Sequence, residues 1–223
     1  NEDSGNGSLM RLAPVPIFFR NNIDEAVKYS GLSSKTTHPG SIASEACQLA
    51  GFIIAKAIKT KDTDIKKFID SCIDEYSKKH EMCEEIKKLI EAEEGPDSKE
   101  LVWNWRDETL KIEECMSNRG KKYNGYPNTL SYFGSYSMDG LAIALNSVYN
   151  TTSFDEAIEK CVNYLGDADS TGSICGQIAG AFYGFKSINK TLVECVNRWD
   201  DREIQLRGIL LGVNPYEFKT IKK

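Results

Sequence analysis

No stretch of 18 consecutive apolar residues occurs in this chain, and no secretory signal begins it. Because a membrane-spanning helix needs about 20 mostly apolar residues, the sequence predicts no transmembrane helix and no membrane partner. Blocks of basic residues interleaved with aromatics are missing too, and 28 Lys and Arg stand against 33 Asp and Glu, for a net charge of −5. The positive footprint typical of nucleic-acid-binding proteins is therefore absent, and nucleic acid is not an expected partner.

Metal and redox motifs built on cysteine or histidine are also missing. The seven cysteines are scattered without a C-x-x-C pair. Such usage is typical of small buried hydrophobes, so we expect a reducing, cytoplasmic environment. The two histidines, His38 and His80, form no pair suited to zinc. By itself, His38 is typical of a structural hydrogen-bonding residue, and His80 of a solvated turn residue.

The sequence does contain a series of amphipathic helical patterns. The clearest lies within 63–77, where apolar residues follow the spacing i, i+3, i+4, i+7, i+8 and i+11. Similar patterns and capping signals predict helices at about 23–29, 41–59, 82–92, 153–165, 166–184, 190–198 and 200–211. Neither a period-2 strand nor an N-G hairpin is predicted. A chain of 223 residues that is 40% hydrophobic can bury one sizeable core, so we expect an all-α, orthogonal multi-helix fold in a single domain, 1–223.

Two tryptophans, Trp103 and Trp105, precede another predicted helix within 103–116. No basic groove accompanies these rings, so they are expected to anchor packing and not to stack on bases.

Residues 166–184, GDADSTGSICGQIAGAFYG, carry the most informative motif. It begins with two carboxylates and two hydroxyls, those of Asp167, Asp169, Ser170 and Thr171. Hard cations such as Mg²⁺ take oxygen ligands, and the two carboxylates with either hydroxyl can supply about half of an octahedral shell. The alternative is capping, because Asp and Ser are favoured at helix N-termini, where a carboxylate complements the helix dipole.

Glycines follow this motif at every fourth position, at 172, 176, 180 and 184. That spacing places them on one helix face, which lowers helix propensity and allows a neighbouring helix to approach closely. The sequence therefore predicts a short buried helix that presents oxygen atoms from its first turn.

Four segments in fixed order resemble those of one family, the ADP-ribosylglycohydrolases, which include ADP-ribosylarginine hydrolases and the dinitrogenase reductase-activating type. They are the loop G-N-G-S-L-M-R (5–11), the segment T-T-H-P (36–39), the loop G-S-Y-S-M-D (134–139) and the segment G-D-A-D-S-T-G (166–172). The resemblance covers essentially the whole chain, and the all-α fold that it implies agrees with the helical patterns.

The resemblance implies a role for each segment. In a site that usually holds two Mg²⁺ ions, it makes metal ligands of Asp167, Asp169 and Ser170. It implies that ADP-ribose is held by Asp3, Ser4, Gly5, Asn6 and Gly7. It also implies that the same cleft is lined by His38, Ser135 and Tyr136. His38 thereby changes from a structural residue to an expected ligand contact.

One part of the family pattern is missing. The family's other metal ligands, in a T-D-D segment, and a catalytic acidic residue lie ahead of the G-N-G loop, and no T-D-D occurs in these 223 residues. We therefore expect this chain to be the C-terminal part of the domain, with half of the metal site. The missing N-terminal segment could come from the same polypeptide, upstream of residue 1.

The resemblance implies a Mg²⁺-dependent hydrolase that removes ADP-ribose from a modified protein side chain by cleaving the glycosidic bond at ribose C1″. The D-A-D-S-T form is more similar to arginine-type than to serine-type members. Two alternatives stay open: a non-catalytic ADP-ribose binder or scaffold that keeps the fold, and a hydrolase of another small nucleotide or glycosidic substrate.

Overall fold

The all-α prediction is confirmed in the structure, a computed structural model that describes residues 4–92, 103–113, 122–123, 126–127 and 132–213. The helices of the first half are η1 (Asn6–Ser8), α1 (Pro14–Phe18), α2 (Ile23–Lys35), α3 (Ser41–Ala57), α4 (Ile65–Lys79) and α5 (Glu84–Glu91). Those of the second half are α7 (Ser137–Tyr149), α8 (Phe154–Val162), α9 (Ala168–Tyr183), η2 (Phe185–Ser187), α10 (Lys190–Asp200) and α11 (Glu203–Val213). No described helix is both long and apolar enough to cross a membrane.

Capping side chains start α4 and α8, and the start of α8 at Ser153 is the predicted one, whereas Asp64 falls inside the predicted helix 63–77 but is the N-cap of α4. The Asp64 side chain accepts hydrogen bonds from two backbone N–H groups of α4, and Ser153 accepts one from the N–H of Glu156 in α8. Helix α2 differs from its prediction, because it passes Gly31 instead of ending there. A Cβ at Gly31 would lie 2.4 Å from the Gln48 side chain of α3, so this glycine serves close helix packing and not termination.

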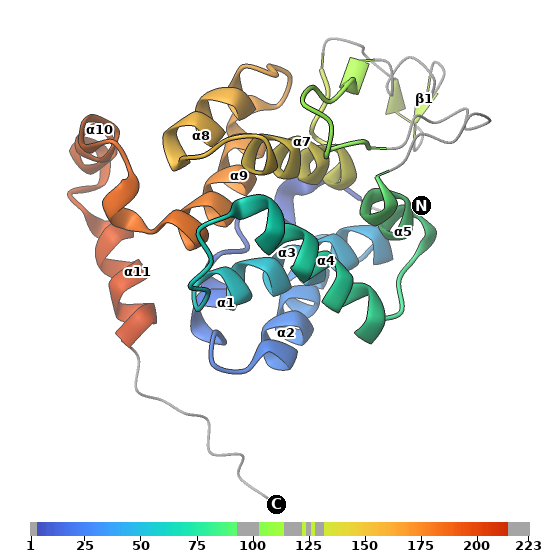
Figure 1. Cartoon of the computed structure of the whole chain (residues 1–223), viewed down its shortest axis with the longest axis horizontal. Helices are drawn as coiled ribbons and strands as arrows, with labels where there is room; N and C mark the ends of the chain where they lie inside the picture. The colour runs from blue at the N-terminus through green and yellow to red at the C-terminus, as the bar shows by residue number, and fades with distance from the viewer. Residues whose placement is uncertain (1–3, 93–102, 114–121, 124–125, 128–131, 214–223) are drawn as a thin grey trace, which may run out of the picture.

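Helices α3 and α7 form the centre of the core (Figure 1). Every residue of α7 is buried, and α3 buries its predicted apolar stripe from Ile42 to Ala57. Helices α2, α4, α5 and α9 all pack against α3, and α8 and α9 pack against α7. This arrangement holds both ends of α7 in place, including the loop that leads into it.

The glycine face of α9 packs against side chains of α8. A Cβ built at Gly172 would lie 3.3 Å from Val162 of α8. The same atom at Gly176 would lie 3.5 Å from Ile158, and at Gly180 it would lie 3.7 Å from Phe154. The predicted close approach is thus confirmed for these three glycines, over which side chains of α8 fit. Gly184 does not belong to this face, because it follows the last residue of α9 and an added Cβ would meet nothing within 4 Å.

A short hairpin corrects the prediction that no strands pair. Strand β1 (Lys122–Tyr123) pairs antiparallel with β2 (Tyr126–Pro127), and Tyr123 lies opposite Tyr126. The sequence between them is Asn-Gly, at 124–125, a dipeptide typical of two-residue hairpin turns that the sequence analysis missed. The pair is too short to change the all-α class.

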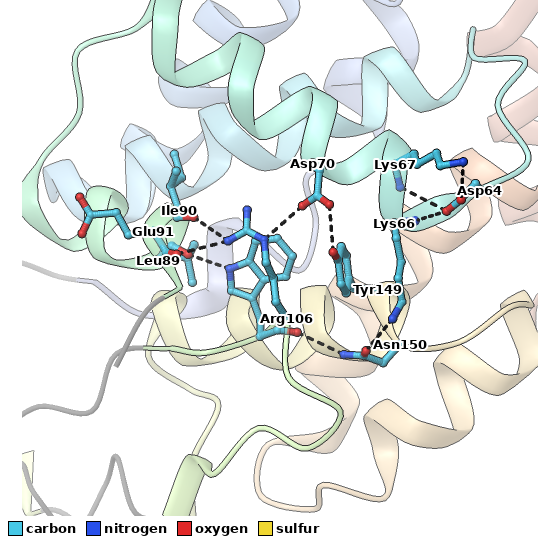
Figure 2. A network of polar contacts seen from close by, with 11 residues as sticks. Asp64, Lys66, Lys67, Asp70, Leu89, Ile90, Glu91, Arg106, Tyr149 and Asn150 are labelled. Carbon is cyan, nitrogen blue, oxygen red and sulfur yellow. Dashed lines mark hydrogen bonds and ion pairs between the residues drawn. The ribbon is translucent and has the colours of Figure 1, made fainter. Parts of the chain in front are cut away.

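The segment from Trp103 to Leu110 forms polar contacts with helices α4, α5 and α7 (Figure 2). Arg106 pairs with Asp70 of α4 at 3.1 Å and donates to the Ile90 carbonyl of α5 at 3.0 Å. Asp70 also accepts from the Tyr149 hydroxyl of α7 at 2.9 Å. Both tryptophans are buried, which confirms them as packing anchors. The helix predicted after them lies mostly outside the described residues.

His80 differs from its predicted solvated state. Its ring stacks on Tyr76 with a centroid distance of 4.4 Å and meets the edge of Phe52 at 6.3 Å. Burial against these rings lowers the pKa of His80, because the charged imidazolium loses hydration there.

The two C-terminal helices, α10 and α11, lie at the edge of the fold (Figure 1). Neither buries a single residue, and Trp199 of α10 is 93% exposed. Helix α11 also continues through Gly212, where the sequence predicts a cap. An apolar hollow of about 590 Å³ lies along these helices and is lined in part by Ile17, Phe154 and Leu192.

Candidate functional site

The G-N-G loop and the loop before α7 form a short antiparallel pair. The Asn6 N–H donates to the Ser135 carbonyl, and the Ser137 N–H donates to the Ser4 carbonyl, both at 2.8 Å. Gly5 lies opposite Tyr136 between these two bonds. The first and third segments of the predicted site are therefore neighbours, although about 130 residues of sequence separate them.

The Asn6 side chain extends this contact to the fourth segment. Asn6 is 6% exposed, and its Nδ2 donates to the Gly134 carbonyl at 2.9 Å and to Oδ2 of Asp167 at 2.7 Å. The backbone N–H of Asp167 in turn donates to the Phe133 carbonyl at 2.8 Å. A single amide group thus joins the loop at 4–8, the loop at 133–137 and the start of α9.

Two glycines with positive φ allow these loops to meet. Gly134 has a φ of +96°, and a Cβ there would lie 2.8 Å from Thr171 Cγ2. Gly166 has a φ of +62°, and a Cβ there would lie 2.5 Å from the Phe133 carbonyl oxygen. Any other residue at either position meets both a strained backbone and a clash.

The two carboxylates at the start of α9 do not cap it. Asp167 occupies the N-cap position, yet its side chain makes no capping hydrogen bond and turns toward Asn6 instead. Asp169 is exposed, and its carboxylate has no hydrogen-bond partner among the described residues. The capping alternative therefore does not account for this pair of carboxylates.

The two hydroxyls of the motif differ in their surroundings. Thr171 is fully buried, and its Oγ1 donates to the Asp167 carbonyl at 3.1 Å. Ser170 is 9% exposed, and within the described part of the chain its hydroxyl makes no hydrogen bond. Of the two, Ser170 is therefore the better candidate to join the carboxylates around a cation.

Tyr132 is a further neighbour of these carboxylates that the sequence analysis did not single out. The negative charge of Asp167, followed by burial and the charge of Asp169, raises the pKa of the Tyr132 phenol. Both carboxylates therefore act on one exposed side chain. No local sequence signal indicates this role, because it depends on the carboxylates at the start of α9.

His38 lies against the G-N-G loop. A Cβ at Gly7 would lie 2.7 Å from His38 Cε1 and 3.0 Å from Nε2, so the ring covers the bare Cα of this glycine. On the other side of the ring, Nδ1 lies 2.9 Å from Thr37 Oγ1. The second segment of the predicted site is thereby joined to the first.

The other predicted residues are placed as follows. Ser4 is buried, and its hydroxyl oxygen has no partner among the described residues. Ser135 is exposed, whereas the ring of Tyr136 is buried and lies 6.2 Å from that of Trp103. Asp3 lies outside the described residues. Within the described residues, no three acidic, histidine or cysteine side chains gather closely enough to hold a metal by themselves.

Comparison with known sequences identifies the family. The family model for ADP-ribosylglycohydrolase matches residues 1–214. This chain belongs to the ADP-ribosylglycohydrolase family.

Known proteins with similar sequences align with most of this chain. The ADP-ribosylarginine hydrolase Tri1 of Serratia proteamaculans is 29% identical over 208 residues, 93% of this chain and 45% of that protein. The ADP-ribosylhydrolase ARH3 of Danio rerio is 28% identical over 194 residues, 82% of this chain and 50% of that protein. The chain therefore spans about half the length of the curated relatives it matches.

A solved structure has the same fold. It is described as an ADP-ribosylglycohydrolase-related protein complex, and it aligns with a TM-score of 0.61 and 23% identity. The alignment covers 95% of this chain and 61% of that one. This likeness concerns the fold of the family member and not its substrate.

Proposed function

We propose that this chain forms part of a Mg²⁺-dependent hydrolase that removes ADP-ribose from modified protein side chains. The observation that carries the proposal is the Asn6 amide, which binds both the loop before α7 and the Asp167 carboxylate. It brings a glycine-rich loop suited to a nucleotide against oxygen atoms suited to a cation. ADP-ribose and an ADP-ribosylated protein are the proposed partners.

The donor set at the start of α9 fits magnesium as one half of a site. Asp167, Asp169 and Ser170 would hold the ion, since Mg²⁺ prefers carboxylate and hydroxyl oxygens. Two of these groups, the Asp169 carboxylate and the Ser170 hydroxyl, have no other hydrogen-bond partner among the described residues. When bound, the ion supplies charge that orients the ribose hydroxyls and polarises the reacting centre.

The chain's own loops would bind the nucleotide. The G-N-G loop would bind through Ser4, Gly5, Asn6 and Gly7, and His38 packs on Gly7 at its edge. Ser135 and Tyr136 would line the opposite side of the same site, with Asp3 as a further contact. The acidic residue that would activate water or protonate the leaving group as the bond at ribose C1″ breaks is expected ahead of the loop, as the family resemblance implies.

Modified arginine is the favoured linkage. The D-A-D-S-T form of the motif supports it, and so does the similarity to the Serratia protein named an ADP-ribosylarginine hydrolase. Two further expectations stay predictions. One is the cytoplasmic location inferred from the cysteines, and the other is the organisation of 1–223 as a single domain.

Titration calorimetry with ADP-ribose, in the presence and absence of Mg²⁺, tests this proposal on the chain itself. We expect wild-type protein to bind ADP-ribose more tightly with Mg²⁺. Asp167→Asn and Asp169→Asn should each abolish the effect of Mg²⁺. Asp74→Asn is the matched control, because Asp74 pairs with Lys78 on the surface of α4. If both site variants respond to Mg²⁺ like the wild type, the metal assignment is wrong.

A second candidate is an ADP-ribose binder without catalytic activity. It is favoured by the finding that the described residues hold no complete cluster of metal-binding side chains. Hydrolysis of ADP-ribosylated arginine by the full-length protein separates the two candidates. Binding without turnover supports the second, and turnover that depends on Mg²⁺ supports the first.

A further inference from the structure

Arg11, the last residue of the G-N-G-S-L-M-R loop, points back at the His38 segment. Its Nη2 donates to Thr37 Oγ1 at 2.8 Å, and also to the Ser33 carbonyl at 3.2 Å and Thr36 Oγ1 at 3.3 Å. The Ser33 carbonyl lies in the last turn of α2 and the two threonines follow that helix directly, at the end where the helix dipole favours a cation.

The backbone before Arg11 is fixed from the other side by α9. The Met10 carbonyl accepts from Ser173 Oγ at 2.7 Å and from Gln177 Nε2 at 2.9 Å. Ser173 lies one turn after Asp169 in α9. The residue before Arg11 is therefore hydrogen-bonded to the helix that begins with the two carboxylates. The backbone at Arg11 is therefore anchored on α9, and its guanidinium contacts Thr37.

The direction of one hydrogen bond at Thr37 is fixed by chemistry. A guanidinium has only donors, so Thr37 Oγ1 must accept from Arg11. The hydroxyl then has a proton of its own to donate, and His38 Nδ1 lies 2.9 Å away. If Nδ1 accepts that proton, the ring carries its own hydrogen on Nε2.

Cε1 and Nε2 form the edge of the His38 ring that lies against Gly7, and Nε2 is the nitrogen on that edge. No described residue forms a hydrogen bond with it. A protonated Nε2 there donates to an oxygen atom, whereas an unprotonated one presents a lone pair that repels anionic oxygens.

We propose that Arg11 and Thr37 are positioning residues that select the tautomer of the His38 ring in which Nδ1 accepts and Nε2 donates. The Nε2–H group then donates to an oxygen atom of the nucleotide bound along the G-N-G loop. The part that concerns the nucleotide rests on the proposed function. The part that concerns the tautomer of His38 does not.

Nitrogen-15 NMR of the histidine rings tests the tautomer without any ligand. The chain has only two histidines, so the His80→Gln background leaves His38 as the single ring in the spectrum. At a pH where the ring is neutral, we expect Nδ1 to resonate as an unprotonated nitrogen and Nε2 as a protonated one. A protonated Nδ1 in this protein overturns the proposal.

Variants at Arg11 and Thr37 test the relay. Thr37→Val removes the donor to Nδ1, and Arg11→Met removes the donor that orients the Thr37 hydroxyl. Both should move the His38 nitrogen shifts toward an average of the two tautomers. Arg11→Lys keeps a group that only donates and should restore the wild-type pattern. Arg20→Met is the control, because Arg20 binds the Gly212 carbonyl far from His38. Unchanged His38 spectra in both relay variants overturn the proposal.

Calorimetry with ADP-ribose tests the part that rests on the proposed function. Loss of one hydrogen bond to a bound oxygen should weaken binding about tenfold in Arg11→Met, with recovery in Arg11→Lys. Equal affinities of wild type and Arg11→Met overturn the nucleotide part. Wild-type protein that has the expected tautomer but binds no ADP-ribose contradicts the proposed function and leaves the relay standing.

Discussion

Asn6 Nδ2 lies 2.7 Å from Asp167 Oδ2, although 161 residues separate the two in sequence. Both side chains are nearly buried, at 6% and 9% exposure. A carboxylate in such a place needs a hydrogen-bond donor, because burial without one costs several kcal/mol. The contact therefore both stabilises the meeting of two loops and sets the direction of one carboxylate of the candidate metal site.

Asn6→Ala should lower stability. It leaves Asp167 Oδ2 and the Gly134 carbonyl without their donor, and an unsatisfied buried polar group costs about 1–3 kcal/mol. Denaturant unfolding followed by circular dichroism measures the loss. Asn163→Ala is the control, since Asn163 donates to the Glu159 carbonyl on an exposed helix end. Equal midpoints for the two variants would contradict the role given to Asn6.

Two Gly→Ala substitutions should have opposite effects. Gly166 has a positive φ and faces the Phe133 carbonyl oxygen, so Gly166→Ala should cost at least about 1–3 kcal/mol. Gly208 lies in α11 with nothing within 4 Å of an added Cβ, and Gly208→Ala should gain about 0.5–1 kcal/mol. Thermal melts of both variants check the signs. A melting temperature of Gly166→Ala at or above that of the wild type would show that the turn is not strained.

Two tryptophans offer a second matched pair. Trp105 is fully buried, and its Nε1 donates to the Leu89 carbonyl at 2.7 Å, so Trp105→Ala should cost about 3–5 kcal/mol. Trp199 is 93% exposed, so Trp199→Ala should stay within about 0.5 kcal/mol of wild type. Unfolding curves measure both. A large loss in Trp199→Ala would mean that α10 is packed more tightly than the structure describes.

Stability should fall in mild acid because of His80. Burial against Tyr76 and Phe52 lowers the pKa of His80 below its ordinary value of 6.5, so the folded protein favours the neutral ring. The unfolded chain then binds the proton more readily, and this contribution to stability is complete above pH 6.5 and lost as the pH falls through the folded pKa. Melting temperatures between pH 7.5 and 5 should show a steeper decline for wild type than for His80→Gln. Parallel declines would mean that His80 titrates alike in both states.

Some of the site could be predicted from sequence because its signals are local. The D-A-D-S-T run, the G-N-G loop and the G-S-Y-S loop are each contiguous, so composition and spacing indicate them. The roles of Tyr132 and His80 could not be predicted, because each depends on neighbours contributed by other elements: the carboxylates at α9 for Tyr132 and the ring of Phe52 for His80. The short hairpin at 122–127 had a local signal in Asn-Gly that was overlooked.

The sequence by itself determined the helical class, several helix starts and the family. Apolar spacing and capping residues act within one or two turns, so the starts of α4 at Asp64 and α8 at Ser153 follow from the chain's own order. Only the tertiary structure decided what the side chains of the motifs do. Asp167 stands where a capping residue is expected, yet it turns to Asn6 because packing of α7 and α9 brings that amide within 2.7 Å. A local signal can offer a side chain several partners, and long-range packing selects the one that it binds.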